Sequence, residues 1–597
     1  MPNFANRKMT GGKVKDMPKA LKTIVAYAKK YKWLILIAVI CAAGSAVFAV
    51  IGPNYVSDLA EVIEDGISST GINIDFSQIT FIACTLVGIY AASIILNYVQ
   101  QFIMNYVACG VGKKMRSDIS TKINRVPLKY FDNHNYGDTL SRVTNDVDSV
   151  TQSLNMSIGS LVAAVATLIG CVIMMFVTQW LMAITAIVAS LIGFVFMVIV
   201  MARSQKYFNA RQTSLAEVSG HIEEYYAGQN IVRAYNAEEE GLGQFRQSNE
   251  KLRKCTFKAE FLSSLMAPIM AFIGNFGYVA VCIVGAALAF KGTINFSVVV
   301  AFMIYVRLFT SPLSQIAQGF SSLQTAAAAA ERVQEFLSED ELSDESNKTA
   351  KLANVKGDVS FEHIKFGYSP DKTIIHDFSI DIKSGQKVAI VGPTGAGKTT
   401  IVNLLMRFYE LDGGKITVDG VALADTTREN VHDQFGMVLQ DTWLFEGTLR
   451  ENLTYGKQGI SDDKLMSALY SCGLKHFVNT LPQGLDTVLN NSVTISAGQK
   501  QLITIARAMI QNAPMIILDE ATSSVDTRTE LMIQSAMDEL TQGRTSFVIA
   551  HRLSTIRDAD IIIYMQGGDI KETGTHSQLL AKNGLYAELY NSQFATA

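Results

Sequence analysis

Six long apolar segments dominate the first half of this 597-residue chain. Each is near or above the about 20 residues that cross a bilayer as an α-helix. Buried helices of a large soluble core are disfavoured, because such frequent apolar runs leave no polar faces for water. The segments predict an α-helical six-span transmembrane bundle within residues 1–325, with spans at about 33–56, 79–107, 156–177, 181–201, 262–290 and 296–323.

Charges in the connecting loops predict the orientation of this bundle. The segment before the first span is rich in lysine, and the loop after the second span carries a run of Lys and Arg that begins at Lys113. The loop after the first span is acidic and has neither Lys nor Arg. Because cytoplasmic loops collect Lys and Arg, we expect both chain termini in the cytoplasm.

Two of the predicted cytoplasmic loops are long. Residues 108–155 and 202–261 show helical periodicity with few breakers, so we expect the spans to continue as intracellular helical hairpins. The hairpin tips, Phe131 to Val150 and Glu223 to Glu239, are predicted to contact a soluble domain. The alternative interpretation is a solvated, charged loop at each tip.

Several polar residues lie inside the predicted spans. Such residues usually face the bundle interior or a water-filled cavity. For each residue taken by itself, an interhelical hydrogen bond without a substrate role is the favoured interpretation. Arg307 stands out because a lone Arg inside the membrane costs free energy. The alternative is that Arg307 lies near the outer interface and extends its charged group to water. The set comprises Asn97, Gln100, Gln101, Asn105, Asn275, Arg307 and Gln315.

The pattern changes after the last span. Residues 326–355 are polar and then acidic, which predicts a linker. Residues 356–597 show short β-type runs and helix-like runs, which predict an α/β domain whose first strands form an antiparallel sheet. Within it, Gly392 to Thr399 fits the G-x-x-x-x-G-K-[ST] pattern between a strand-like run and a helix-like run.

This glycine-rich pattern predicts a nucleotide site. Backbone N–H groups of such a loop point at phosphate oxygens, and the helix N-terminus adds positive potential. Lys398 is expected to reach the β- and γ-phosphates, and the Thr399 hydroxyl to bind Mg²⁺. The alternative is a Gly-rich turn with an exposed lysine.

Polar residues at the ends of other predicted strands complete the site. Asp519 is placed to join the Mg²⁺ shell, and Glu520 to activate a water that attacks the γ-phosphate. Gln440 can contact metal and water, and His551 the γ-phosphate. Tyr368 lies 24 residues before Gly392, where an aromatic ring can stack on adenine, although a plain sheet aromatic is the alternative.

A second predicted helix N-terminus follows the sequence Ser496, Ala497, Gly498 and Gln499. It offers another phosphate-binding position, and one domain does not need two such positions for one ATP.

These motifs together resemble the ATP-binding cassette (ABC) transporters. The motifs that show this resemblance are GPTGAGKT, VLQ, ISAGQKQ, MIILDEATSSVD and IAHR. The six spans that precede them resemble an exporter-type half-transporter. The resemblance implies that two P-loop ATPase domains close head to tail, with each ATP between one chain's P-loop and its partner's signature. It assigns catalysis to Glu520, His551 and Gln440, and metal binding to Thr399, Gln440 and Asp519. It assigns ATP binding to Tyr368, Gly392, Pro393, Thr394, Gly395, Ala396, Gly397, Lys398, Thr399, Thr400, Gln440, Ser496, Ala497, Gly498, Gln499, Asp519 and Asp526.

The signature departs from the family pattern. The family consensus is LSGGQ, whereas this chain reads ISAGQ, and the methyl group of Ala497 should weaken a backbone contact with phosphate. Glu520 is retained. This combination resembles the subunit of bacterial heterodimeric multidrug exporters that keeps the catalytic glutamate. It implies a second half-transporter with a consensus signature and a replaced glutamate, and the rival is a homodimer that tolerates Ala497.

The expected function is therefore ATP-driven export of amphipathic or hydrophobic compounds across a bacterial plasma membrane. The expected cofactors are ATP and Mg²⁺. A lipid or peptide exporter is an alternative within the class, and an ATP-gated sensor or channel is the alternative outside it. The net charge of −3 gives no global field that favours nucleic acid. The seven cysteines have no metal-site spacing.

Overall fold

The computed structural model describes residues 16–68, 71–72, 74–440, 442–490, 495–519, 526–550 and 556–594. The chain divides into two compact units. The first comprises residues 1–124 and 136–339, and the second comprises residues 125–135 and 340–597. The short segment of residues 125–135, which interrupts the first unit in the sequence, thus belongs with the C-terminal unit.

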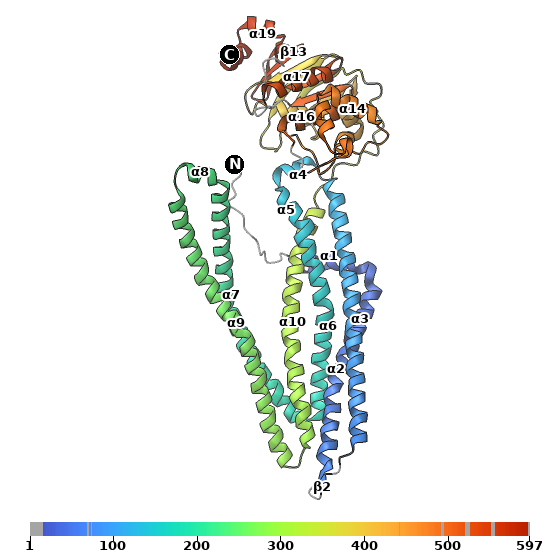
Figure 1. Ribbon diagram of the computed structural model, residues 1–597, viewed down its shortest axis with the longest axis vertical. Helices are drawn as coiled ribbons and strands as arrows, with labels where there is room; N and C mark the ends of the chain where they lie inside the picture. The colour runs from blue at the N-terminus through green and yellow to red at the C-terminus, as the bar shows by residue number, and fades with distance from the viewer. Residues whose placement is uncertain are drawn as a thin grey trace. The chain divides into compact units, whose positions relative to one another are not determined.

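The first unit is helical (Figure 1). Among the residues that the structure describes, six of its helices are long and apolar enough to cross a membrane, which confirms the six-span prediction. Its elements are α1 (Met17–Ala28), η2 (Lys29–Tyr31), α2 (Lys32–Gly66), β1 (Ile67–Ser68), β2 (Gly71–Ile72), α3 (Phe76–Ile123), α5 (Tyr136–Ser141), η3 (Arg142–Asp146), α6 (Val147–Thr178), α7 (Trp180–Ala227), α8 (Gln229–Ala234), α9 (Glu238–Phe290) and α10 (Phe296–Leu337).

The helices run well past their apolar segments. α7 and α9 have 48 and 53 residues, which exceeds the about 20 residues that span a bilayer, and they form one long hairpin with α8 at its tip (Figure 1). α2, α3, α6 and α10 pack together as a bundle. The expected extension of the spans into helical hairpins is thus present.

Proline interrupts the hydrogen-bond ladder in three of these helices. Pro53 lies inside α2, Pro268 inside α9 and Pro312 inside α10. Each proline removes one backbone N–H from the ladder of its helix. Near Pro53, the Tyr305 hydroxyl of α10 donates a hydrogen bond to Asn54 Oδ1 of α2 at 2.6 Å.

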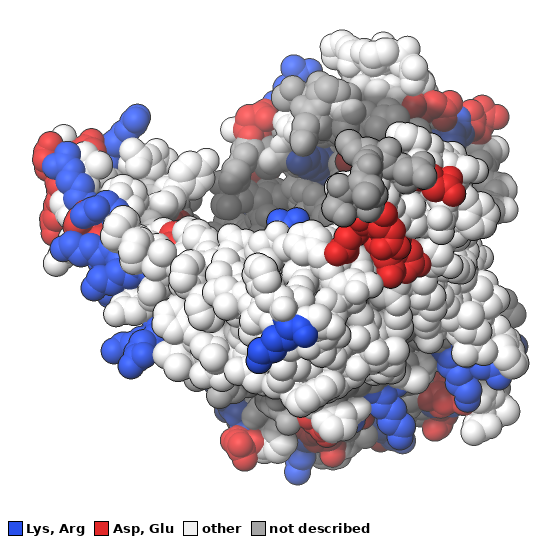
Figure 2. Space-filling view, turned by 90° about the horizontal axis from the view of Figure 1, so that it is seen from below, with Lys and Arg blue, Asp and Glu red and all other residues white. Residues whose placement is uncertain are grey.

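One end of the first unit carries an acidic group. Figure 2 looks onto the end where α2 meets the β1–β2 hairpin, and most of this face consists of uncharged residues with acidic side chains gathered on one side. The last turns of α2 contribute Asp58, Glu61, Glu64 and Asp65. The orientation of the bundle in the membrane stays a prediction from the loop charges.

The second unit is an α/β domain with two main sheets. The six-stranded sheet has the order β14-β13-β5-β12-β11-β8, and all of its neighbours pair in parallel except β13 and β14. Its strands are β5 (Lys387–Val391), β8 (Phe435–Val438), β11 (Met515–Asp519), β12 (Thr545–Ile549), β13 (Ile561–Gln566) and β14 (Asp569–Gly574). Because parallel strands end at the same edge, residues that follow them gather there.

An antiparallel sheet packs beside it, as the sequence predicts, with the order β4-β3-β6-β7. Its strands are β3 (Val359–Phe366), β4 (Ile375–Ile382), β6 (Gly413–Val418) and β7 (Val421–Ala422), and a two-stranded pair joins β9 (Gly447–Thr448) to β10 (Val488–Leu489). The two main sheets share one apolar core, and the helices packed on the parallel sheet form another.

The helices of the second unit are α4 (Leu128–Asn133), α11 (Lys398–Leu405), η4 (Leu423–Asp425), α12 (Arg428–Asp433), α13 (Leu449–Thr454), α14 (Asp462–Ser471), α15 (Lys475–Thr480), η5 (Gly484–Asp486), α16 (Ala497–Gln511), α17 (Thr527–Thr541), α19 (His576–Lys582) and α20 (Leu585–Phe594). The predicted fold class, a helical membrane domain followed by an α/β ATPase-type domain, is therefore confirmed.

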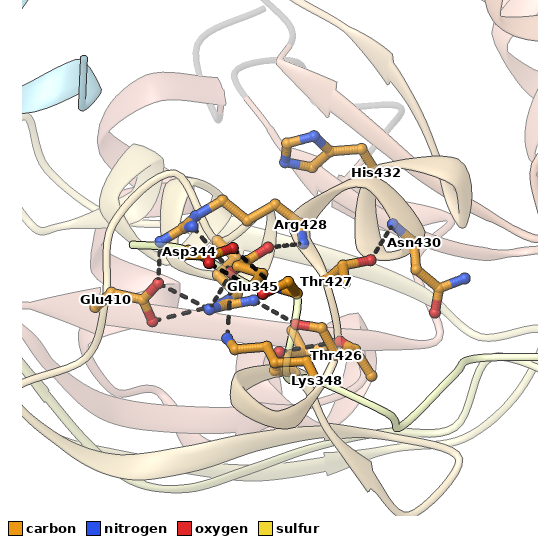
Figure 3. Close-up of polar contacts among 12 residues, drawn as sticks. Asp344, Glu345, Lys348, Glu410, Thr426, Thr427, Arg428, Asn430 and His432 are labelled. Carbon is orange, nitrogen blue, oxygen red and sulfur yellow. Dashed lines mark hydrogen bonds and ion pairs between the residues drawn. The ribbon is translucent and has the colours of Figure 1, made fainter. Parts of the chain in front are cut away.

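An ion-pair cluster fixes part of the predicted linker to this unit (Figure 3). The Glu345 carboxylate lies 2.8 Å from Arg407 Nη2 and 2.9 Å from Arg428 Nη1, and it also accepts the Arg428 backbone N–H at 2.7 Å. Glu410 contacts both arginines from the other side. Since Arg407 follows α11 closely, the cluster ties the linker to the end of that helix.

Candidate functional site

The glycine-rich loop joins the end of β5 to the start of α11, at the edge where the parallel strands end. Gly392 has φ 148° and Gly397 has φ 98°, values that favour glycine. A Cβ atom at Gly392 would lie 2.1 Å from the Met565 carbonyl oxygen, so no other residue fits there without a shift of the backbone. The predicted strand–loop–helix setting is therefore present.

Lys398 folds back onto its own loop. Its Nζ atom donates hydrogen bonds to the carbonyl oxygens of Gly392 at 2.8 Å and Pro393 at 3.1 Å. Burial lowers the pKa of Lys398, while the nearby Asp519 carboxylate acts to raise it. A phosphate group would offer the ammonium stronger, charged acceptors than these carbonyls.

Asp519 lies level with the start of this loop. It pairs with Ile549 of β12, and Ile549 pairs with Ile390 of β5, so the three residues form one row across the sheet. Thr399 is exposed in the first turn of α11. Hydroxyl and carboxylate oxygens are the ligands that Mg²⁺ prefers, so Thr399 and Asp519 fit the predicted metal site.

Gln440 lies two residues beyond β8, which pairs with β11, and it is exposed at the same edge. Glu520 directly follows β11, and His551 follows β12 by two positions. Both lie outside the described residues, so their roles stay predictions.

Tyr368 belongs to an aromatic cluster beside α11. Its ring meets those of Phe366 and Tyr409 edge to face, with both pairs of centroids 5.0 Å apart. Its hydroxyl lies 3.2 Å from Thr400 Oγ1. Tyr368 is half-buried, and its predicted contact with adenine stays a prediction.

The predicted signature forms the N-terminus of the 15-residue helix α16. Ser496 Oγ accepts the Gln499 N–H at 3.2 Å, and Gln499 Oε1 accepts the Ser496 N–H at 3.0 Å, which is a capping box. Ala497 is exposed at the first helical position and fits without strain, whereas Gly498 is buried. Among the described residues, no hydrogen bond joins these four to the glycine-rich loop.

Asp526 caps a different helix. Its carboxylate accepts the Thr529 N–H at 3.1 Å at the start of α17, and the hydrogen bonds from Thr529 lower the pKa of Asp526. The structure thus brings together the glycine-rich loop, Asp519 and Gln440 at one sheet edge, and it places Ser496 to Gln499 and Asp526 on separate helix N-termini.

One contact extends the site toward the first hairpin. The Tyr409 hydroxyl donates a hydrogen bond to Asp132 of α4, and α4 belongs to the same compact unit. Burial, together with the Asp132 carboxylate, raises the pKa of Tyr409. Asp132 lies in the first predicted hairpin tip, but the sequence offers no signal that picks out Tyr409. The contact predicted for the second tip stays a prediction.

Two family profiles match the chain, one described as the ABC transporter transmembrane region over residues 35–313 and one described as ABC transporter over residues 375–523. A fatty acid ABC transporter ATP-binding/permease protein of Mycobacterium bovis is 43% identical over 87% of this chain and 82% of its own length. The chain belongs to the ABC transporter family. Another ABC transporter, the uncharacterized ATP-binding protein YfiC of Bacillus subtilis, is 35% identical over 98% of this chain and 95% of its own. An ATP-dependent lipid A-core flippase of Syntrophus aciditrophicus is 31% identical over 90% of each chain.

As an ABC exporter half-transporter, the chain carries its membrane domain and its ATPase domain in one polypeptide, and it couples ATP hydrolysis to transport. This activity explains why the glycine-rich loop and the six spans occur in a single chain.

Proposed function

We propose that this ABC exporter uses Mg·ATP to move amphipathic, lipid-like molecules out of a bacterial cell, as one half of a two-chain transporter. The observation that carries the proposal is the sheet edge that holds Asp519 and the glycine-rich loop leading to Lys398 and Thr399, in a chain that also spans the membrane. The sequence alone favours a broad set of amphipathic compounds. The names of the fatty acid transporter and the lipid A-core flippase support the lipid alternative.

The chemistry follows from the residues at this edge. ATP phosphates replace the loop carbonyls as acceptors for Lys398, and the backbone N–H groups at the start of α11 bind the same phosphates. Bound Mg²⁺ would neutralise the charge that develops on the phosphate oxygens, with Thr399 and Asp519 as its protein ligands. Glu520 orients the attacking water, and Gln440 and His551 complete the site.

Proteoliposomes that hold the transporter with its ATPase domains outward test this function. ATP should drive fluorescent fatty acid or phospholipid analogues into the lumen, and Glu520→Gln should bind ATP without turnover. Wild-type hydrolysis by Glu520→Gln would refute the role of that residue. Equilibration of the analogues without accumulation would instead support an ATP-gated channel.

The proposed partner is a second half-transporter with a consensus signature and a replaced glutamate. The support is Ala497, which sits on the exposed helix N-terminus where a phosphate would approach. The purified chain alone should therefore show little ATPase activity. Robust ATPase activity that amphipathic compounds stimulate in a lone-chain dimer would contradict the heterodimer.

A further inference from the structure

Helix α10 carries a line of exposed polar side chains that begins inside its predicted span and ends just beyond it. They recur at intervals of three or four residues, so they share one face of the helix. The line comprises Arg307, Ser311, Gln315, Gln318, Ser321 and Thr325, and all six residues are exposed. The opposite face packs into the bundle through apolar residues such as Phe309 and Gly319. We call the six residues the polar stripe.

This stripe is poorly suited to contact lipid tails, because polar side chains in hydrocarbon are costly. The neighbouring helix α9 gives a contrast. Its exposed face at membrane depth carries Phe272, Phe276 and Ile283, which suit lipid. A line of Gln and Ser side chains fits a water-filled path instead. A third helix, α3, also exposes a line of polar residues, Asn97, Gln101 and Asn105 at four-residue spacing, but these residues are uncharged.

Arg307 ends the stripe and is its only charged member. It lies 11 residues after Phe296, where α10 begins, so it is about 16 Å along the helix at about 1.5 Å per residue. The hydrocarbon core of a bilayer is about 30 Å thick, so this distance is about half of that thickness. It is too long for the side chain to extend back to the water at the helix end. Within the described ranges, Arg307 has no ion-pair partner.

The same face becomes apolar one turn further toward the start of α10. Met303 lies four residues before Arg307, and the Tyr278 hydroxyl of α9 lies 3.2 Å from its Sδ atom. On the other side, Gln315 Nε2 lies 3.4 Å from Ser311 Oγ. Arg307 thus marks a boundary between a hydrogen-bonding path and an apolar, partly aromatic surface.

We propose that Arg307 binds the anionic headgroup of an amphiphile, whose apolar tail lies toward Met303 and Tyr278. A guanidinium can hold a carboxylate or a phosphate through two parallel hydrogen bonds, and Ser311 one turn away can donate a third. The headgroup reaches this depth along the polar stripe. The inference rests on the proposed lipid-like substrate class and narrows it to anions.

The test compares matched amphiphiles on the assembled full-length transporter in nanodiscs, with stimulated ATPase activity as the readout. Oleate and dodecyl phosphate carry the two anionic headgroups, and oleyl alcohol and dodecanol are their neutral counterparts. The wild type should respond to the anions at concentrations about tenfold lower than to the alcohols. Arg307→Gln should abolish this preference, and its response to the alcohols should match that of the wild type. A preference for only one anion would identify the headgroup as carboxylate or phosphate.

Two further variants guard against misfolding of Arg307→Gln. Ser311→Glu places a carboxylate one turn from Arg307 and should weaken anion binding with the arginine still present. Lys291→Gln, between α9 and α10, removes a cation outside the stripe and should change nothing. If Arg307→Gln and Ser311→Glu both keep the preference for anions, the inference is wrong. If neither anions nor alcohols stimulate the wild type, the proposed lipid-like substrate class fails, and the inference fails with it.

Discussion

The carboxylate of Glu345 and the guanidinium of Arg407 lie 2.8 Å apart, and the Arg407 side chain is only 5% exposed. Burial alone would raise the pKa of Glu345, but its hydrogen bonds and ion pairs with Arg428, Lys348 and Arg407 outweigh burial and lower it. The cluster in Figure 3 therefore attaches the segment after α10 to the end of the P-loop helix.

Glu345→Gln should loosen this attachment. Loss of this charge leaves the buried Arg407 with the Glu410 carboxylate and the neutral Thr426 carbonyl oxygen as partners, at a cost of about 1–3 kcal/mol in the free energy of unfolding of the ATPase domain. Urea unfolding followed by Trp443 fluorescence, with Trp33 and Trp180 replaced by Phe, measures this cost. Asp340→Asn, at an exposed acid nearby in the same linker, should have no effect.

Lys398→Gln should weaken Mg·ATP binding by at least about tenfold, because a neutral amide loses the charge-assisted hydrogen bonds to phosphate. Binding of a fluorescent ATP analogue to the full-length chain measures the change. Lys415→Gln alters an exposed lysine that pairs with Glu362, and it should bind ATP like the wild type. Equal affinity in both variants would contradict the role of Lys398.

Tyr409→Phe should separate ATP hydrolysis from its stimulation by transported compounds. The change keeps the aromatic packing against Tyr368 and removes only the hydroxyl that donates to Asp132. Basal ATPase activity should stay within about twofold, and stimulation by amphiphiles should fall. The control is Tyr470→Phe, at a partly exposed tyrosine of α14. Undiminished stimulation in Tyr409→Phe would show that this hydrogen bond carries no signal.

Ala497→Gly should increase the ATPase activity of the purified chain alone, because each site of a lone-chain dimer would combine Ala497 of one copy with Glu520 of the other. Ala497 is exposed at the start of α16, and removal of its methyl group lets a phosphate approach the backbone more closely. Because glycine lowers helix stability by about 1 kcal/mol, thermal unfolding of the variant is measured alongside. An unchanged rate with intact stability would mean that the methyl group does not limit hydrolysis.

His432 should make the ATPase domain less stable in mild acid. Burial is the main cause that lowers its pKa; the charge of Arg428 adds to this effect, and the Met406 carbonyl, Asp433 and Glu345 oppose it. As the pH falls below about 6.5, His432 therefore takes up a proton in the unfolded chain more readily than in the folded chain. The free energy of unfolding decreases over this pH range as a result. In urea unfolding at pH 7.5 and 5.5, His432→Gln should lose less stability than the wild type. His476→Gln, at an exposed histidine of α15, should behave like the wild type.

The sequence predicts the parts of the site that depend on local pattern. Apolar runs locate the spans, and the strand–glycine–lysine pattern locates the P-loop, because parallel strands must end at one edge. It does not predict that Tyr409 binds Asp132, 277 residues away, because no local pattern encodes such a contact. The sequence does predict that the first hairpin tip contacts a soluble domain, but it does not predict that the whole segment 125–135 belongs with the second unit. Nor does it predict that Lys398 donates hydrogen bonds to the carbonyl oxygens of Gly392 and Pro393 in its own loop.

Pro312 lies directly after Ser311, in the middle of α10. It has no N–H, so the carbonyl oxygen of Leu308 accepts no hydrogen bond from the following turn. Because this backbone hydrogen bond is already missing, a bend of α10 at Pro312 does not have to break it. The part of α10 before Pro312 can therefore tilt against the rest of the helix, and carry Arg307 with it, without local melting.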